Sequence, residues 1–489
     1  MIDLTVVESG LERAIRRVQE RGIVIPTFAQ MKDPARTPAP IRDRLGSVGL
    51  WDLNPLNLFR ITWKNEPTPQ GGGFGGVNVL EFPPSLTGVE ARILALVGKW
   101  FPTGAHKVGA AFGCLVPRLV TGQFDPTSQK AVWPSTGNYC RGGAYDSALL
   151  GCDSIAILPE GMSRERFEWL SKIAGEVIKT PGSESNVKEI FDKVWELRGS
   201  GQDLMIFNQF EEFGNYLWHY EVTGHAMEEA LRQAMRPGDR YAGVALTTGS
   251  AGTIACGDYL KQAFPGSRVA ASEALQCPTL LWNGFGAHRI EGIGDKHVPW
   301  IHNLRNTDVV MAIDDAAVVH LARLFNEPAG RRYLDAQGVT SDIVERLDLL
   351  GFSGIANMLS AIKLAKYFEL GGQDIVLTVL TDSMELYGSR LREMHAEHGA
   401  YEEGRAAFHD GRYLKGIATD AMLELRGPDR KRIHNLKYFT WVEQQGRTYE
   451  EIQAQWHDED YWTGVQRQVP AIDALIEEFN RKAGVVEGL

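Results

Sequence analysis

The sequence has few cysteines, no long uninterrupted apolar run and no surplus of positive charge. An odd number of widely spaced cysteines without any CxxC pair argues against a disulfide framework and a zinc site. They are Cys114, Cys140, Cys152, Cys256 and Cys277. No apolar run approaches membrane-spanning length, and the N-terminal residues show no signal-peptide pattern. We therefore expect a cytoplasmic protein that resides in a reducing compartment and has no membrane partner.

The charge balance excludes a further class of partner. Lysine and arginine number 51 against 62 aspartates and glutamates, so the formal net charge is −11 and no global basic field can hold nucleic acid. Hydrophobic residues at 44% and charged residues at 23% are ordinary for a globular chain and exclude a disordered or fibrous one. The 489 residues predict about two to four domains.

Short apolar runs alternate with longer segments of helical periodicity through the middle of the chain. This alternation predicts an α/β fold with mostly parallel sheets. Strands are expected at residues 92–97, 155–158, 244–247 and 375–380, and helices at residues 163–173, 186–197, 224–235 and 256–264. Ligands of open α/β sheets bind beyond the carboxyl ends of the strands, so the polar loops there are the candidate sites.

The two ends of the chain differ from this middle part. The first 80 residues contain a helical start and irregular sequence that ends in the glycine-rich stretch 70–76. We interpret that stretch as a loop, because neither a preceding strand nor a following helix suggests a phosphate cradle. From about residue 390 the strands stop and the sequence becomes helical and charged, which predicts an added helical region.

A lysine, Lys107, follows the turn Thr103-Gly104-Ala105-His106 and opens a helix of small and apolar residues. Burial on such a face would lower the pKa of the amine toward the range in which the free amine attacks carbonyl groups. That is what a Schiff-base lysine requires. The alternative is an ordinary surface lysine at the start of a helix.

Two loops have compositions suited to anions. Residues 135–138, Ser-Thr-Gly-Asn, lie between an expected strand and helix and could present N–H groups and short side chains to a carboxylate. A helix cap supplied by Ser135 or Thr136 is the alternative. Residues 249–253, Gly-Ser-Ala-Gly-Thr, follow the strand at 244–247 and could bring backbone close to a phosphate at a helix start. A tight turn without a ligand is the alternative there.

A lysine, a carboxylate-type loop and a phosphate-type loop, in that order, are what a pyridoxal phosphate enzyme requires. Over residues 86–390 the chain resembles the cysteine synthase and cystathionine β-synthase group of the tryptophan synthase β-like, fold type II enzymes. The segments that carry the resemblance are 135–138, 158–166, 208–210, 219–224, 249–253, 288–294 and 381–387.

The resemblance implies a role for each matching residue. Lys107 would form the aldimine with pyridoxal 5'-phosphate and move the Cα proton. The remaining cofactor contacts would come from His106, Asn138, Gly249, Ser250, Ala251, Gly252, Thr253 and Ser383, and the substrate contacts from Ser135, Thr136, Gly137, Tyr139 and Gln209. A neutral serine at the pyridine nitrogen would make the ring a weaker electron sink and favour loss of a β-substituent. Asp382 is adjacent, so the sequence leaves open which of the two side chains faces the ring.

Some residues depart from the family pattern. The lysine motif Thr-Gly-Ala-His-Lys is similar to that of tryptophan synthase β, with His106 near the phosphate, whereas the loop 135–138 is of the cysteine synthase type. Tyr139 and Cys140 stand where smaller residues are usual, which predicts an altered side-chain pocket. A metal site at His288, Asp295 and His297 is the less favoured interpretation of that segment, because their spacing matches no known site, and we expect no metal.

The resemblance also implies an organisation and an activity. We expect an N-terminal extension at 1–85, a large cofactor-binding domain at 86–110 and 226–390, a small mobile substrate domain at 111–225, and a helical extension at 391–489. The implied reaction is β-elimination or β-replacement, through an aminoacrylate, on a β-substituted L-amino acid of the cysteine, O-acetylserine, O-phosphoserine or serine type. The alternatives are a serine/threonine-type dehydratase that yields a 2-oxo acid and a catalytically reduced scaffold protein. A homodimer is also implied.

Overall fold

Two separate β-sheets organise the molecule. The computed structural model describes residues 1–135 and 137–485. The larger sheet has the order β1 (Val79–Phe82), β2 (Arg92–Val97), β10 (Asp374–Leu380), β7 (Arg240–Thr247), β8 (Arg268–Ala274), β9 (Val309–Ile313) and β11 (Met422–Glu424). The smaller sheet has the order β5 (Glu176–Thr180), β4 (Ser154–Pro159), β3 (Lys130–Pro134) and β6 (Leu204–Ile206). All four strands of the smaller sheet thus come from one stretch of the chain.

The predicted α/β class is confirmed. The smaller sheet is parallel throughout, and the larger one is parallel except for its edge strands β1 and β11. Every residue of β2, β4 and β10 is buried, as expected for parallel strands with both faces covered by helices. The apolar runs expected as strands at 92–97, 155–158, 244–247 and 375–380 lie within β2, β4, β7 and β10.

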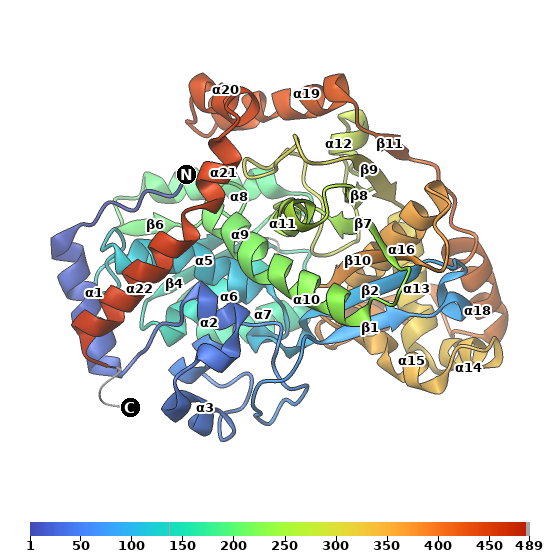
Figure 1. Ribbon diagram of the computed structural model, residues 1–489, viewed down its shortest axis with the longest axis horizontal. Helices are drawn as coiled ribbons and strands as arrows, with labels where there is room; N and C mark the ends of the chain where they lie inside the picture. Colours follow the sequence, from blue (N-terminus) through green and yellow to red (C-terminus); the bar gives the residue numbers. More distant parts are fainter. Residues whose placement is uncertain (136, 486–489) are drawn as a thin grey trace.

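Helices cover both sheets (Figure 1). Those before β2 are α1 (Glu8–Arg21), α2 (Phe28–Lys32), α3 (Ala39–Leu45) and α4 (Pro84–Thr87). Those between β2 and β10 are α5 (Lys107–Val120), α6 (Asn138–Leu149), α7 (Arg164–Ile173), α8 (Val187–Arg198), α9 (Phe213–Trp218), α10 (Gly224–Ala234), α11 (Ala255–Ala263), α12 (Thr279–Trp282), α13 (Asp315–Asn326), α14 (Pro328–Ala336), α15 (Ser341–Glu345) and α16 (Phe352–Tyr367). Those after β10 are α17 (Gly388–His398), α18 (Glu403–His409), α19 (Gly427–Asn435), α20 (Tyr449–His457), α21 (Tyr461–Gln466) and α22 (Val469–Ala483).

The C-terminal region is helical, but the expectation that strands end near residue 390 is wrong. β11 pairs antiparallel with β9 and extends the larger sheet. Three residues are too few to give a periodic pattern, and their pairing partner lies far away in the sequence, so the chain alone did not indicate this strand. The last helix, α22, packs on α1 and α5, so the first and last helices of the chain lie side by side (Figure 1).

A buried lysine holds part of the C-terminal region against the rest of the molecule. Nζ of Lys437 donates to the carbonyl oxygens of Trp300 and His302, both at 2.8 Å, and to Oε1 of Gln455 at 2.7 Å. Three acceptors satisfy the three donors of a buried ammonium group. Within the described residues, no helix is long and apolar enough to cross a membrane.

Two buried histidines near Lys437 lead us to expect a smaller free energy of unfolding in acid. Burial, followed by the charge of Lys437, lowers the pKa of both His302 and His434 to about 3. The unfolded chain binds these protons near the ordinary value of 6.5, so between pH 6.5 and 3 it holds more protons than the folded chain, and acidification favours unfolding. We expect the free energy of unfolding, measured by urea denaturation, to fall on lowering the pH from 7 to about 5. Replacing both histidines with glutamine should make this dependence less steep, with the remainder due to other buried histidines such as His106. An unchanged pH dependence in that variant would contradict the assignment.

Candidate active site

The chemistry-bearing segments meet where the strands end. Lys107 opens α5, Ser135 follows β3, Asn138 opens α6, the loop 248–254 follows β7, and Asp382 and Ser383 follow β10. Because the carboxyl ends of parallel strands lie at one edge of each sheet, both sheets present polar loops to the same region. Hydrogen bonds among these loops show that the site lies between the sheets, with Lys107 at its centre.

The amine of Lys107 is partly buried and joins two loops. Its Nζ donates to Oε1 of Gln209 at 3.2 Å and to Oγ of Ser250 at 3.0 Å. Burial lowers the pKa of this amine to about 8, although nearby Cys114 and Glu184 favour the charged form. A lysine with this pKa has a much larger neutral fraction near pH 7 than an exposed one, which suits it to attack a carbonyl group or to accept a proton.

The loop after β3 is connected to Lys107 through Gln209. Nε2 of Gln209 donates to Oγ of Ser135 at 3.2 Å, and the same hydroxyl accepts from the backbone N–H of Gly137 at 3.2 Å. The N-cap of α6 is Gly137, not a hydroxyl residue, so the interpretation of Ser135 as the helix cap is wrong. The serine oxygen instead accepts the hydrogen bonds from Gln209 and Gly137. Thr136 lies outside the described residues.

Gly137 itself is required by its backbone and by its neighbour. Its φ of 156° is a conformation that side chains rarely adopt, and a Cβ there would lie 2.7 Å from Nε of Arg166. Arg166 therefore supports the underside of the loop that carries Ser135 and Asn138.

The loop after β7 is built around the hydroxyl of Ser250. This oxygen accepts from Nδ2 of Asn215 at 3.0 Å and from the backbone N–H of Gly252 at 3.4 Å, in addition to Lys107. Asn215 leaves no room for a side chain at position 252, since a Cβ there would lie 2.1 Å from its Oδ1. Ala251 has a positive φ of 63°, and the loop leads through Thr253 into α11. A Cβ placed at Gly249 would lie at ordinary contact distance, 3.6 Å, from Cα of Ile293.

Asp382 at the end of β10 holds Asn138. Its Oδ2 accepts from Nδ2 of Asn138 at 2.6 Å and from the hydroxyl of Tyr387 at 2.8 Å, with Nη2 of Arg166 at 3.8 Å. Its other oxygen lies against Gly351, where a Cβ would be 1.9 Å away. Burial raises the pKa of Asp382, and Arg166 opposes this effect. The carboxyl group is thus engaged with Asn138 and Tyr387, while Ser383 beside it is also buried.

Arg166 and Arg390 share one carboxylate. Glu291 contacts Nη1 of Arg166, accepts from Nε of Arg390 at 2.5 Å and accepts from the backbone N–H of Ser163 at 3.4 Å. Glu291 lies on the segment 288–294, and Arg390 lies on α17. These contacts tie the start of α7, which lies between β4 and β5 of the smaller sheet, to the segment between β8 and β9 of the larger sheet and to α17 after β10.

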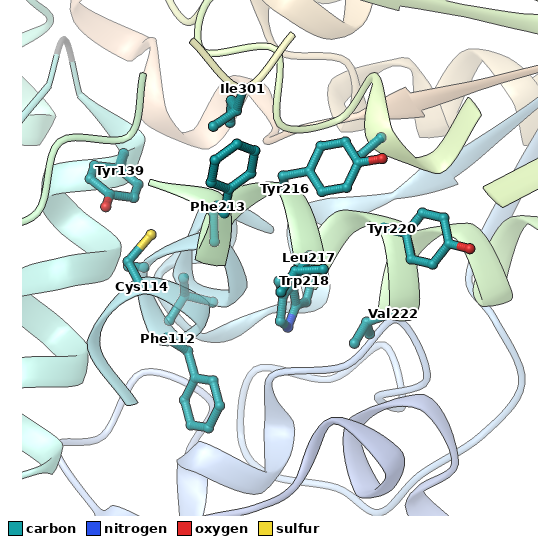
Figure 2. Packing of buried hydrophobic residues seen from close by; sticks show 14 of the residues in the cluster. Phe112, Cys114, Tyr139, Phe213, Tyr216, Leu217, Trp218, Tyr220, Val222 and Ile301 are labelled. Carbon is teal, nitrogen blue, oxygen red and sulfur yellow. The ribbon is translucent and has the colours of Figure 1, made fainter. Parts of the chain in front are cut away.

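Two further predicted residues are enclosed in aromatic surroundings. His106 immediately precedes Lys107, lies between Trp63 and His219, and is kept neutral because burial lowers its pKa to about 3. Tyr139 packs edge-to-face on Trp133 and points toward Cys114 (Figure 2). The ring of Tyr139 is therefore part of the hydrophobic core, and its contact with substrate stays a prediction.

The sequence interpretation missed several residues of this site. Asn215 orders the loop after β7, Glu291 bridges two arginines, and Arg141 is buried one turn after Asn138. Arg141 alone had a visible signal, since a charged residue follows Asn138 by three positions on a helix otherwise rich in small and apolar residues. His297 bonds to Asp295 at 2.8 Å, and no group of three or more potential metal ligands occurs within the described residues.

Comparisons with known proteins agree with this geometry. Residues 91–331 match the family model described as "Pyridoxal-phosphate dependent enzyme". A cysteine synthase from Staphylococcus aureus is 28% identical over 314 residues, covering 64% of this chain and 93% of the relative. An O-acetylserine sulfhydrylase isoform 3 from Entamoeba histolytica has a similar structure, with a TM-score of 0.56 at 23% identity over 70% of this chain and 94% of that one. A hydrogen sulfide-producing enzyme from Fusobacterium nucleatum gives a TM-score of 0.53 at 22% identity, over 68% and 92%.

Residues 91–331 therefore belong to the pyridoxal-phosphate dependent enzymes. The protein is an enzyme of this class, with the fold of the cysteine synthases. The family resemblance and the cofactor expected from the sequence are confirmed.

The residues present fit this cofactor. Lys107 offers a partly buried amine of lowered pKa for its aldehyde, and the small residues 249–253 just before α11 offer a place for its phosphate. The hydroxyls of Thr248 and Ser353 and Oδ1 of Asn138 are buried without a hydrogen-bond partner. Buried polar atoms are normally satisfied, so the unpaired ones of Asn138 and Thr248, on the segments that follow β3 and β7, are what a polar ligand would satisfy.

The contact between Asp382 and Asn138 predicts a measurable positioning effect. In an Asp382→Leu variant Asn138 and Tyr387 lose the carboxylate that accepts both their hydrogen bonds. A buried donor without an acceptor costs about 1–3 kcal/mol, so we expect kcat to fall about tenfold or more. Asp382→Asn, which keeps an acceptor oxygen, should recover most of the rate. Steady-state kinetics of the cofactor-loaded variants checks this, and equal losses in both variants would show that the charge, and not the hydrogen bond, matters.

Proposed function

We propose that this enzyme catalyses β-elimination or β-replacement on a β-substituted L-amino acid of the cysteine, O-acetylserine, O-phosphoserine or serine type. The observation that carries the proposal is the partly buried Lys107 amine, hydrogen-bonded at once to Gln209, for which we propose a contact with substrate, and to Ser250, for which we propose a contact with phosphate. Relatives named as cysteine synthase and as a hydrogen sulfide-producing enzyme support the same pair of reactions.

Bound pyridoxal phosphate supplies an electron-withdrawing system that makes the Cα–H bond of an attached amino acid acidic. Nζ of Lys107 accepts that proton, and the β-substituent leaves with the electron pair of its bond to Cβ. In replacement a nucleophile then bonds to Cβ and the proton returns to Cα. In elimination water enters, and a 2-oxo acid and ammonia are the products.

The surrounding residues orient these atoms. Ser135 and Gln209 are hydrogen-bonded to each other. We propose that they hold the substrate carboxylate, and that Gln209 then gives up its hydrogen bond to Lys107 for one to the carboxylate. Asp382 fixes the amide of Asn138, and the neutral hydroxyl of Ser383 is proposed to face the pyridine nitrogen. A hydroxyl there does not force protonation of the ring, which favours expulsion of the β-substituent over a long-lived carbanion.

The test is a spectroscopic and product assay on the cofactor-loaded protein. Visible absorbance is recorded before and after addition of L-cysteine, L-serine, O-acetyl-L-serine or O-phospho-L-serine, and release of 2-oxo acid and of the β-substituent is measured in parallel. We expect one of these amino acids to change the spectrum and release its substituent. Release of both products indicates elimination, and release of the substituent that depends on an added thiol indicates replacement. No spectral change and no product with any of them would overturn the proposal.

A further inference from the structure

A buried cation beside the site is not used by the proposed chemistry. Arg141 lies in the first turn of α6, three residues after Asn138, and is 1% exposed. Its guanidinium stacks on Trp169 at 4.8 Å and on Trp51 at 5.5 Å from the ring centroids. Stacking stabilises the flat faces of a guanidinium but leaves the N–H groups at its edge unsatisfied.

Two nitrogens at the edge of this guanidinium lack partners. Nε and Nη1 of Arg141 are buried and have no hydrogen-bond partner, and Arg141 makes no ion pair within residues 1–135 and 137–485. A buried cation without a partner is costly and calls for an anion. Asp146 on the same helix does not supply it, since burial alone raises the pKa of that carboxyl well above its usual range.

The carboxylates near Arg141 already interact with other residues. Burial and then the charge of Arg166 lower the pKa of Arg141 to about 10, so it is still a cation at neutral pH, while Asp382 acts in the opposite direction. Asp382, however, accepts from Asn138 and Tyr387 and lies 3.8 Å from Arg166, and Glu291 is shared by Arg166 and Arg390. Arg141 is thus the one arginine of this cluster that enters no ion pair within residues 1–135 and 137–485.

The position of Arg141 relates it to the reacting region. The ring of Trp51, on which it stacks, lies so close to Gly104 that a Cβ there would be 2.7 Å from Cζ2, and Gly104 precedes Lys107 by three residues. Thr103, beside Gly104, has a positive φ of 67° and a buried hydroxyl without a partner. Unsatisfied polar atoms of Thr103, Asn138 and Arg141 thus come from the two segments that begin α5 and α6.

We propose that Arg141 is a specificity-determining residue that recognises a negatively charged group on the substrate other than its α-carboxylate. This inference rests on the proposed function and narrows it to L-amino acids whose β-substituent is an anion. A guanidinium donates to carboxylate and phosphate oxygens, and in a buried site such charge-assisted hydrogen bonds are strong. Of the four substrate types considered above, O-phosphoserine carries such a group and O-acetylserine does not.

The experiment compares an anionic and a neutral substrate on matched variants of the cofactor-loaded enzyme. Arg141→Met keeps an apolar side chain between the tryptophans but removes the charge, and Arg141→Lys restores a cation. Arg198→Met is the control, because Arg198 stacks on Trp195 at 4.7 Å on the exposed surface of α8. Three substrates are compared. The β-substituent of O-phospho-L-serine carries a phosphate, that of O-succinyl-L-serine carries a carboxylate, and that of O-acetyl-L-serine carries no charge.

We expect Arg141→Met to lower kcat/KM for the preferred anionic substrate about 100-fold, mainly through KM, and to change that for O-acetyl-L-serine less than about threefold. Lysine should recover part of the loss, and Arg198→Met should match the wild type. A larger effect on O-phospho-L-serine than on O-succinyl-L-serine identifies phosphate as the anion, and the reverse identifies carboxylate. Equal losses for charged and neutral substrates would overturn the inference.

A binding measurement keeps this inference separate from the proposed function. In a cofactor-loaded Lys107→Ala background, titration calorimetry measures binding of O-phospho-L-serine with Arg141 present or replaced by methionine. Binding of O-phospho-L-serine that is tighter with Arg141 present supports the inference. If the enzyme turns over no amino acid but shows this binding, the proposed function is refuted and the inference stands. Turnover of O-acetyl-L-serine together with no Arg141-dependent binding of either anionic amino acid would refute the inference alone.

Discussion

Replacing Lys107 with alanine is expected to leave a folded protein that releases the β-substituent at least about 10³-fold more slowly than the wild type. The physical reason is that this amine is both the attachment point for the cofactor and the base beside Cα. The structure prepares it for both tasks by burial, which lowers its pKa to about 8, and by hydrogen bonds to Gln209 and Ser250. Product release by the cofactor-loaded protein, followed over hours, measures the loss.

The control for this prediction is Lys172→Ala, which removes an exposed lysine from α7. It should turn over at the wild-type rate. The pH dependence of the wild type supplies a second check: because the neutral amine is the reactive form, the rate of cofactor capture by the cofactor-free protein should rise with pH up to about 8 and then level off. Turnover by Lys107→Ala within about tenfold of the wild type would remove Lys107 from the mechanism.

The second large effect is expected at Gly252. An alanine there would place its Cβ 2.1 Å from Oδ1 of Asn215, which is fully buried and hydrogen-bonded to Ser250 and to the carbonyl oxygen of Gln209. Displacing Asn215 breaks both bonds and moves the loop that we assign to the phosphate. We expect Gly252→Ala to weaken binding of pyridoxal phosphate about 100-fold, measured by absorbance titration of the cofactor-free protein.

Gly266→Ala is the matched control, because a Cβ at that position meets no atom within 4 Å. Its cofactor affinity and melting temperature should equal those of the wild type. Should Gly252→Ala bind pyridoxal phosphate as tightly as this control does, the loop 249–253 would not be the phosphate site. A variant that binds weakly and also melts early would be compared with the wild type at a temperature where both are folded.

Local patterns predicted most of the fold. Strands such as β2 and β10 are continuous apolar runs because both faces of a parallel sheet are covered, and that signal is visible without any tertiary information. The same holds for α7, α8, α10 and α11, whose apolar residues recur with helical spacing. By contrast, β11 is three residues long and is defined by its pairing with β9, a contact that no local pattern contains.

The candidate site shows the same division. Lys107, Ser135, Gln209 and Ser250 were expected together, and the structure connects them by hydrogen bonds. Two of the residues that hold them, Asn215 and Glu291, were not expected, because they act through contacts with residues that lie far away in the sequence. The sequence left open whether Asp382 or Ser383 faces the ring of the cofactor. The structure shows that the carboxyl group of Asp382 accepts hydrogen bonds from Asn138 and Tyr387.

The most direct test of the central claim is to locate the cofactor on the chain. The cofactor-loaded protein is reduced with borohydride, digested and examined by peptide mass spectrometry. The account predicts one pyridoxyl group on the peptide that contains Lys107, and none on that peptide in the Lys107→Ala variant. A protein that carries no such group after incubation with pyridoxal phosphate, or that carries it on another lysine such as Lys363, would contradict the assignment of this site.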